Sequence, residues 1–213
     1  MQDVLEQLKA GIRRFQTTVY PEQAAMYRKA VSVPQEPHTL FVACADSRIE
    51  PETITQTKPG EMFVLRNIGN LIPAYGEMMG GVSAVVEYAV SLLKVKHVVI
   101  CGHADCGAMK GLLNPDSVTT MPAVQNWLKN ATAAKSIAEV LEAKSDAPET
   151  LMRSVTEQNV LLQIQHLRTH PSVAAAMARE ELTVSGWVYE IGTGEVRISE
   201  GGSKEFIPVS GAM

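Results

Sequence analysis

Short apolar runs alternate with longer amphipathic stretches along most of the chain. Residues 39–44 and 61–66 form runs that are too short for buried helices and are typical of strands buried on both faces. Residues 82–94 carry apolar side chains at helical spacing, and 97–102 form another apolar run. A strand, a helix and a strand in this order predict parallel pairing. We therefore predict an α/β fold with a mostly parallel central β-sheet flanked by helices.

The second half of the chain adds further helices and a pair of strands. Helical patterns are predicted over 107–113, 123–134, 149–167 and 171–181, with a turn-rich segment at 114–120 and a loop at 144–149. The alternating segment 182–191 predicts a strand, and the glycine-containing turn at 192–194 leads into a second strand at 195–199.

The first 30 residues carry an apolar stripe at helical spacing without a strand beside it. The stripe consists of Val4, Leu5, Leu8, Ile12 and Phe15. A helical arm of this kind has no core of its own to cover, so we expect it to pack on a partner subunit. We predict one domain over 1–213 whose residues 1–30 form this arm, in a homodimer or a tetramer.

Composition and charge narrow the possible partners. The chain has 213 residues, 46% of them hydrophobic, which is enough for one full core. Its net charge is −4 and no dense cluster of Lys or Arg occurs, so no nucleic-acid partner is expected. The apolar stretch 82–95 is interrupted by Glu87 and Lys94 and is shorter than the roughly 20 residues that cross a bilayer, so no membrane association is expected. The first residues lack the pattern of a signal peptide, and we expect a cytoplasmic location.

Three cysteines occur, an odd number in a chain that is large enough to need no disulfides. Cys44 ends the first predicted strand, and His103 and Cys106 follow the strand at 97–102, so all three are expected at the carboxyl edge of the sheet. Two thiolates and one imidazole suit zinc, and three protein ligands leave a fourth position open, as in catalytic zinc sites. The spacing also allows Cys101 to share a strand face with His103. Packed cysteines beside a hydrogen-bonded loop histidine are the alternative.

Asp46 and Arg48 follow the first candidate ligand directly. A planar guanidinium can hold a carboxylate through paired hydrogen bonds. A carboxylate held in this way beside an open metal position could steer a metal-bound water or receive its proton. The alternative is an ordinary salt bridge within a turn.

Four motifs, in this order, resemble those of the β-class carbonic anhydrases, and most of all the bacterial and plant-type branch. They are Cys44-Ala-Asp-Ser-Arg48, Arg66-Asn-Ile-Gly-Asn70, the segment 80–90, and Cys101-Gly-His-Ala-Asp-Cys-Gly-Ala-Met109. The resemblance extends through 121–124, 157–173 and 186–191, so it covers nearly the whole chain.

The resemblance implies reversible hydration of carbon dioxide to bicarbonate and a proton by a zinc-bound hydroxide. It implies one zinc ion per chain, held by Cys44, His103 and Cys106. Asp46 and Arg48 would form the catalytic dyad beside the metal. Cys101 would then be a packed strand residue.

The resemblance also implies which residues contact the substrate. Gln35 would hydrogen-bond it, Phe63 and Tyr88 would line a narrow apolar cleft, and the amide of Gly107 would donate to it. For both aromatic residues, core packing is the alternative. In the resembling family the active site lies at a subunit interface, so Gln35, Phe63 and Tyr88 could face the metal of either subunit.

Two other functions stay open from the sequence. The same metal could act on carbon disulfide or carbonyl sulfide, or Asp46 could close the coordination sphere of a noncatalytic zinc protein. A redox role is disfavoured because no Cys-x-x-Cys motif is present. Phe41 stands where an allosteric subgroup of the family has Trp in a bicarbonate pocket, so that regulatory site is not expected. Ala104 stands where many relatives have Ser.

Overall fold

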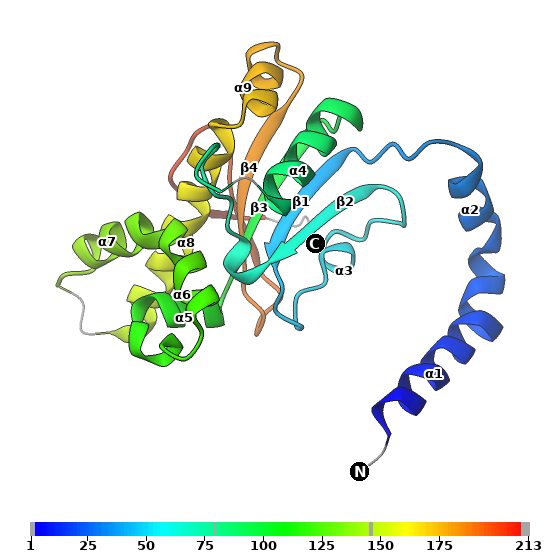
Figure 1. Cartoon of the computed structure of the whole chain (residues 1–213), viewed down its shortest axis with the longest axis horizontal. Coiled ribbons are helices and arrows are strands. Elements are labelled where there is room, and N and C mark those ends of the chain that lie inside the picture. The colour runs from blue at the N-terminus through cyan, green and yellow to red at the C-terminus, as the bar shows by residue number, and fades with distance from the viewer. Residues whose placement is uncertain (1–2, 79, 145–146, 210–213) are drawn as a thin grey trace. The chain divides into compact units, whose positions relative to one another are not determined.

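The computed structural model describes residues 3–78, 80–144 and 147–209. The chain divides into two compact units, Met1–Glu36 and Pro37–Met213. The first unit is helical: α1 (Val4–Arg14) continues through a π-helical turn, η1 (Phe15–Val19), into α2 (Tyr20–Ser32) (Figure 1). Asp3 caps α1 by accepting a hydrogen bond from the backbone N–H of Leu5 at 3.0 Å.

The apolar stripe of α1 remains exposed in the single chain. Val4, Leu5, Leu8 and Ile12 expose between 55 and 66% of their surface. The predicted N-terminal helix is confirmed, and its packing on a partner subunit stays a prediction.

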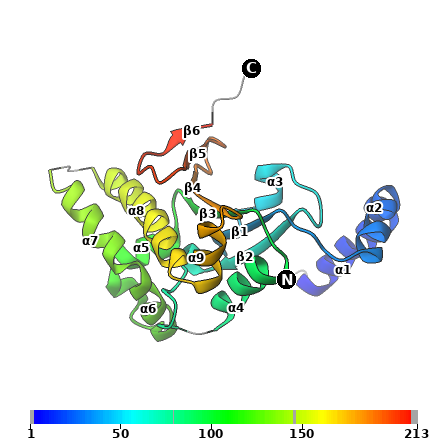
Figure 2. The same cartoon turned by 90° about the horizontal axis from the view of Figure 1, so that it is seen from above.

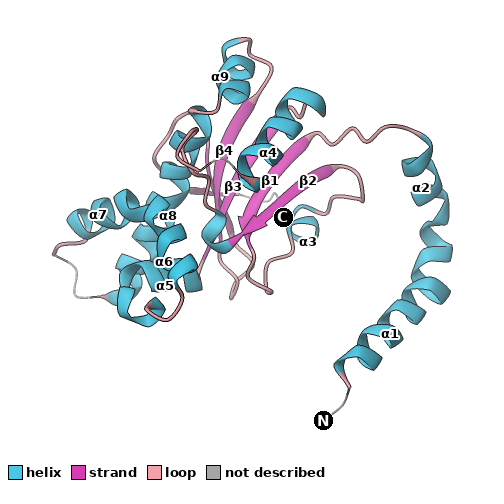
Figure 3. Cartoon of the chain, viewed as in Figure 1, coloured by secondary structure: helices cyan, strands magenta, loops and turns pink. Residues whose placement is uncertain are grey.

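The second unit is built on one sheet with the strand order β2-β1-β3-β4-β5-β6. Figure 3 shows the part of the sheet formed by β2, β1, β3 and β4. The strands are β1 (Thr39–Cys44), β2 (Met62–Asn67), β3 (His97–His103), β4 (Thr183–Tyr189), β5 (Val196–Ser199) and β6 (Ile207–Pro208). The first four run parallel, while β5 is antiparallel to β4 and β6 is antiparallel to β5. The predicted mostly parallel sheet is confirmed.

Helices cover the sheet, as the view from above shows (Figure 2). They are α3 (Pro51–Thr55), α4 (Gly81–Glu87), α5 (Gly107–Leu113), α6 (Pro122–Leu128), α7 (Thr132–Leu141), α8 (Pro148–Arg168) and α9 (Pro171–Ala178), with short helical turns η2 (Ile68–Asn70), η3 (Tyr88–Leu92), η4 (Pro115–Val118) and η5 (Lys129–Ala131). Leu40 and Val42 of β1 pack in one core with side chains of α4, α8 and α9, and Phe41 and Ala43 pack in another core with Ile49. This explains why β1 is buried along its whole length.

Several boundaries differ from those predicted. The helix at 82–94 ends in the π-helical turn η3, the one at 123–134 is divided by η5 and continues to Leu141, and the one at 171–181 ends at Ala178. Of the loop predicted at 144–149, residues 145–146 lie outside the described residues, and Pro148 already begins α8, where its fixed φ suits the first helical turn. Helix α3 and strand β6 were not predicted. None of the described helices is long and apolar enough to span a bilayer.

Candidate metal centre

Three potential ligands converge at the carboxyl edge of the sheet. Cys44 ends β1, His103 ends the neighbouring parallel strand β3, and Cys106 stands directly before α5. Their ligand atoms all lie within 4.8 Å of one another, and all three residues are buried. In the part of the chain that the structure describes, this is the one group of three or more His, Cys, Asp or Glu residues placed to hold a metal ion.

The hydrogen bonding of His103 tests whether these residues fit a metal. Its Nδ1 lies 2.8 Å from the carbonyl oxygen of Ala104, and because a carbonyl only accepts, Nδ1 carries the proton. Its Nε2 is buried and has no hydrogen-bond partner among the described residues. A buried polar atom without a hydrogen-bond partner is destabilising. A histidine that binds a metal through one ring nitrogen is oriented by a hydrogen bond from the other nitrogen, as Nδ1 makes here. The donor set therefore fits a metal ion.

The two thiols of the cluster influence each other. A hydrogen bond with the Cys106 thiol lowers the pKa of Cys44, although burial opposes this, and the backbone N–H of Gly69 also donates to the Cys44 sulfur at 3.5 Å. The same contact with Cys44 raises the pKa of Cys106. Gly69 has φ 75°, and a Cβ there would lie 2.9 Å from the Cβ of Ala108, so glycine is required for this approach. The site thus favours one thiolate, the form that binds metals.

Cys101 lies apart from this cluster. It packs with Phe41, Ala43 and Val99, and its thiol donates to the carbonyl oxygen of Gly102 at 3.4 Å. Burial raises its pKa to about 12. The geometry therefore separates Cys101 from the other two cysteines, which the spacing alone did not.

The guanidinium of Arg48 binds the Asp46 carboxylate through two hydrogen bonds, one to each oxygen. Its Nε donates to Oδ1 at 2.9 Å and its Nη2 donates to Oδ2 at 2.7 Å. The backbone N–H of Arg48 adds a third bond, to Oδ1 at 3.0 Å. These hydrogen bonds hold the pKa of Asp46 well below its usual range and raise the pKa of Arg48. Asp46 is therefore a charged hydrogen-bond acceptor at neutral pH.

Arg66, at the end of β2, anchors the backbone around the cluster. Its Nε donates to the carbonyl oxygen of Cys44 at 3.1 Å, and its Nη2 donates to that of Asp46 at 2.6 Å. Arg66 belongs to the second sequence motif, but no pattern in the sequence indicates which carbonyl groups it binds.

Asp105 and Lys110 also join the cluster without having been singled out from the sequence. Nη1 of Arg48 donates to Asp105 Oδ2 at 2.8 Å, and the Lys110 ammonium pairs with the other oxygen of the same carboxylate. A contact between residues so far apart along the chain leaves no periodic signal in the sequence.

The comparisons with known proteins agree with this geometry. A family model described as carbonic anhydrase matches residues 39–196. A carbonic anhydrase of Pseudomonas aeruginosa is 41% identical over 210 residues, which cover 99% of this chain and 92% of the relative. The solved β-carbonic anhydrase CcaA superposes with a TM-score of 0.91 at 34% identity, covering 98% of this chain and 93% of that one. The chain belongs to the β-carbonic anhydrase family.

The predicted resemblance is thereby confirmed, and the enzyme is a carbonic anhydrase, a lyase. It is also similar to one of two tetrameric β-carbonic anhydrases of Sordaria macrospora, with a TM-score of 0.80 at 31% identity over 94% of this chain and 98% of that one.

The residues predicted to contact the substrate of this carbonic anhydrase lie in three places. Gly107 is exposed and opens α5 directly after Cys106, so its amide makes no hydrogen bond within the helix. Phe63 and Tyr88 stack on each other with ring centroids 5.9 Å apart. Gln35 is exposed in the first unit, between α2 and β1.

The aromatic pair does not lie beside the ligand cluster of its own chain. Phe63 is in register with Leu40. That position is roughly 13 Å along the strand from Cys44, at about 3.3 Å per residue. Tyr88 is 43% exposed, so it is not a core residue of the single chain. Any contact of this pair with a metal centre would therefore be with that of another subunit.

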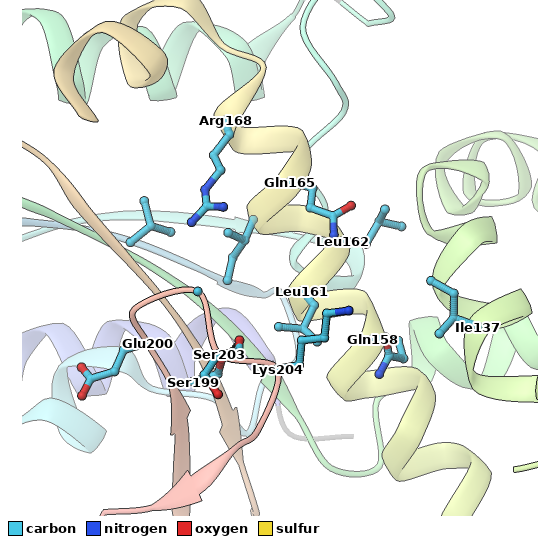
Figure 4. Close-up of a pocket in the computed structure, with 13 residues that line it drawn as sticks. Ile137, Gln158, Leu161, Leu162, Gln165, Arg168, Ser199, Glu200, Ser203 and Lys204 are labelled. Carbon is cyan, nitrogen blue, oxygen red and sulfur yellow. Dashed lines mark hydrogen bonds between the residues drawn. The ribbon is translucent and has the colours of Figure 1, made fainter. Parts of the chain in front are cut away.

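A separate cavity of about 200 Å³ lies between α8 and the loop after β5 (Figure 4). Leu161 and Leu162 from α8 and Lys204 from the loop are among its lining residues. None of the predicted site residues lines it.

Proposed function

We propose that this carbonic anhydrase hydrates carbon dioxide reversibly to bicarbonate and a proton at one zinc ion per chain, held by Cys44, His103 and Cys106. The observation that carries the proposal is the buried Nε2 of His103, which has no hydrogen-bond partner among the described residues and lies beside two thiols. Two thiolates and one imidazole suit zinc, and three protein ligands leave one position for water. When bound, zinc supplies Lewis acidity, which lowers the pKa of a coordinated water.

Asp46 is the catalytic carboxylate in this proposal. Oδ1 accepts two hydrogen bonds from Arg48 and Oδ2 accepts one, so Oδ2 retains a lone pair for the reacting water. Because its pKa is lowered, Asp46 stays ionised and accepts a hydrogen bond from that water, orienting the water oxygen toward the carbon of carbon dioxide. The water oxygen forms the new C–O bond and the released proton passes to solvent.

The backbone amide of Gly107 is the other group of the chain that takes part in the proposed reaction. It follows Cys106 and has no partner within α5, so it can donate to an oxygen of the bicarbonate as negative charge develops there. Two thiolate ligands place more negative charge at the site than imidazoles would, so a coordinated water would lose its proton at a higher pH. We therefore expect faster hydration at alkaline than at neutral pH.

The proposal includes a homodimer or a tetramer. The exposed stripe of α1 supports it, because an amphipathic helix is stabilised by covering its apolar face, and the similar Sordaria protein is described as tetrameric. In this assembly Gln35, Phe63 and Tyr88 would contact the carbon dioxide bound in a partner subunit. A cytoplasmic location remains a prediction.

The test is stopped-flow hydration of carbon dioxide at alkaline pH, with the metal content measured on the same sample. Fast turnover with one zinc per chain, abolished by a chelator and restored by zinc, is the expected result. Stoichiometric zinc without turnover would contradict the proposal. Carbon disulfide and carbonyl sulfide, assayed in parallel, would then identify a different small substrate.

A further inference from the structure

The guanidinium of Arg48 lies between two carboxylates that come from different loops. It binds Asp46 through Nε and Nη2, and it turns Nη1 toward Asp105, whose Oδ2 lies 2.8 Å away. Nη2 also lies 3.3 Å from the backbone carbonyl oxygen of Asp105. Lys110, from α5, pairs with the remaining oxygen of Asp105. These side chains link the loop after β1 to the loop between β3 and α5.

The Asp46–Arg48 pair is not fixed by its own contacts alone. The two residues are close neighbours in one loop, and the Arg48 side chain is 44% exposed. The backbone N–H of Arg48 also holds Asp46 Oδ1, but an ion pair with one exposed side chain contributes little on its own, so these bonds leave the guanidinium weakly fixed. Attaching the far side of the guanidinium to the second loop fixes its plane, and with it the direction of the Asp46 carboxylate.

The backbone of Asp105 supports this role. Its φ of 58° lies in the left-handed region, which Asp and Asn adopt more readily than most residues. This conformation brings both the carbonyl oxygen and the side chain of Asp105 to Arg48. Glycine would satisfy the turn equally well, so the carboxylate is explained by the contact with Arg48 and not by the turn.

We propose that Asp105, supported by Lys110, is a positioning residue. It holds Arg48 so that the Asp46 carboxylate faces the reacting water. This inference rests on the proposed function of Asp46. Asp105 acts through Arg48 and does not contact the substrate.

The first measurement compares variants of the zinc-loaded protein in carbon dioxide hydration. Asp105→Gly keeps the turn and removes the carboxylate, and we expect kcat/KM to fall on the order of tenfold with zinc stoichiometry unchanged. Asp105→Asn keeps the turn and one acceptor oxygen, and it should retain activity to within about threefold. Asp116→Asn makes the same charge change at another exposed aspartate and should leave activity unchanged.

The second measurement does not depend on turnover. With arginine labelled by ¹⁵N, NMR follows the exchange of the Arg48 Nε proton with water, the signal being assigned by its loss in Arg48→Lys. We expect exchange to be about two- to fivefold faster in Asp105→Gly than in wild type, and unchanged in Asp116→Asn.

Full activity or wild-type exchange in Asp105→Gly would overturn the inference. If the wild-type protein had zinc but did not hydrate carbon dioxide, the proposed function would fail. The exchange measurement would still decide whether Asp105 holds Arg48.

Discussion

The two ends of β3 each carry a histidine, and the two residues are in opposite situations. At the amino end, His97 has Nδ1 at 2.6 Å from the Thr183 hydroxyl and Nε2 at 2.7 Å from the Ser185 hydroxyl. At the carboxyl end, His103 uses Nδ1 in the same way but leaves Nε2 buried without a partner in the described chain. A histidine on a strand is therefore structural when both ring nitrogens are satisfied, and a candidate ligand when one buried nitrogen is not.

The largest expected effect comes from replacing one histidine and not the other. His103→Gln removes the unpartnered nitrogen, so we expect zinc to fall well below one per chain and hydration activity to fall by about 10³-fold or more. His97→Gln should keep both. Metal analysis and stopped-flow assays on the two variants check this, and a zinc-replete, active His103→Gln protein would show that the ligand has been misidentified.

Cys106 and Cys101 give a second matched pair of variants. Cys106 belongs to the ligand cluster, whereas Cys101 lies on β3 and packs in the core. Cys106→Ser replaces a soft thiolate by a weakly binding hydroxyl, and we expect zinc and activity to be lost together. Cys101→Ala removes a packed side chain, which costs stability while one zinc per chain is retained. If Cys101→Ala lost its zinc, the separation of the cysteines drawn from the geometry would be wrong.

A smaller effect is expected from replacing Asp46, which in the proposed function contacts the reacting water and not the metal. Asp46→Asn should retain one zinc per chain and lose activity by about 10²-fold. The amide binds Arg48 more weakly than the carboxylate does, and it no longer offers a charged acceptor to the water. Full turnover by this variant would exclude the proposed role. Loss of zinc would indicate that Asp46 helps to hold the metal.

Much of this site could be predicted from the sequence, for a physical reason. The apolar runs ending at Cys44 and before His103 predict parallel strands, and parallel strands bring their carboxyl ends to one edge. The pattern of residues does not show which side chains from different loops contact each other, so the contact of Asp105 with Arg48 was not predicted. Sequence order also does not give the distance of Phe63 along the sheet from the ligands, so the sequence left open which subunit's metal Phe63 would face.

The fold boundaries show the same limit. The π-helical turns at Phe15–Val19 and Tyr88–Leu92 continue the apolar pattern of the helices that precede them, so periodicity alone does not separate them. Strand β6 (Ile207–Pro208) is too short to give an alternating pattern. These elements have no local pattern of their own, whereas the buried strands are indicated by local composition.

The smallest expected effect concerns the pH dependence of stability at His97. Burial lowers its pKa, and the nearby Glu200 carboxylate opposes this shift only in part. Since the pKa is higher in the unfolded chain, that state binds the proton first as the pH falls. The contribution of His97 to the free energy of unfolding is therefore complete above about pH 6.5 and declines below it, until the pKa of the folded state is reached.

His97→Gln isolates this contribution, because glutamine does not titrate. At neutral pH we expect the variant to be less stable by about 1 kcal/mol, the value of one hydrogen bond. This difference should shrink as the pH falls through about 6.5, because only the wild type loses the His97 contribution. Urea unfolding of both zinc-loaded proteins across this range measures it, and comparing the two cancels any common loss of zinc in acid. A difference that stayed constant would mean that His97 has the same pKa in the folded and unfolded states, and one that widened with acid would mean that folding raises its pKa. Either result would contradict the lowering of the His97 pKa by burial.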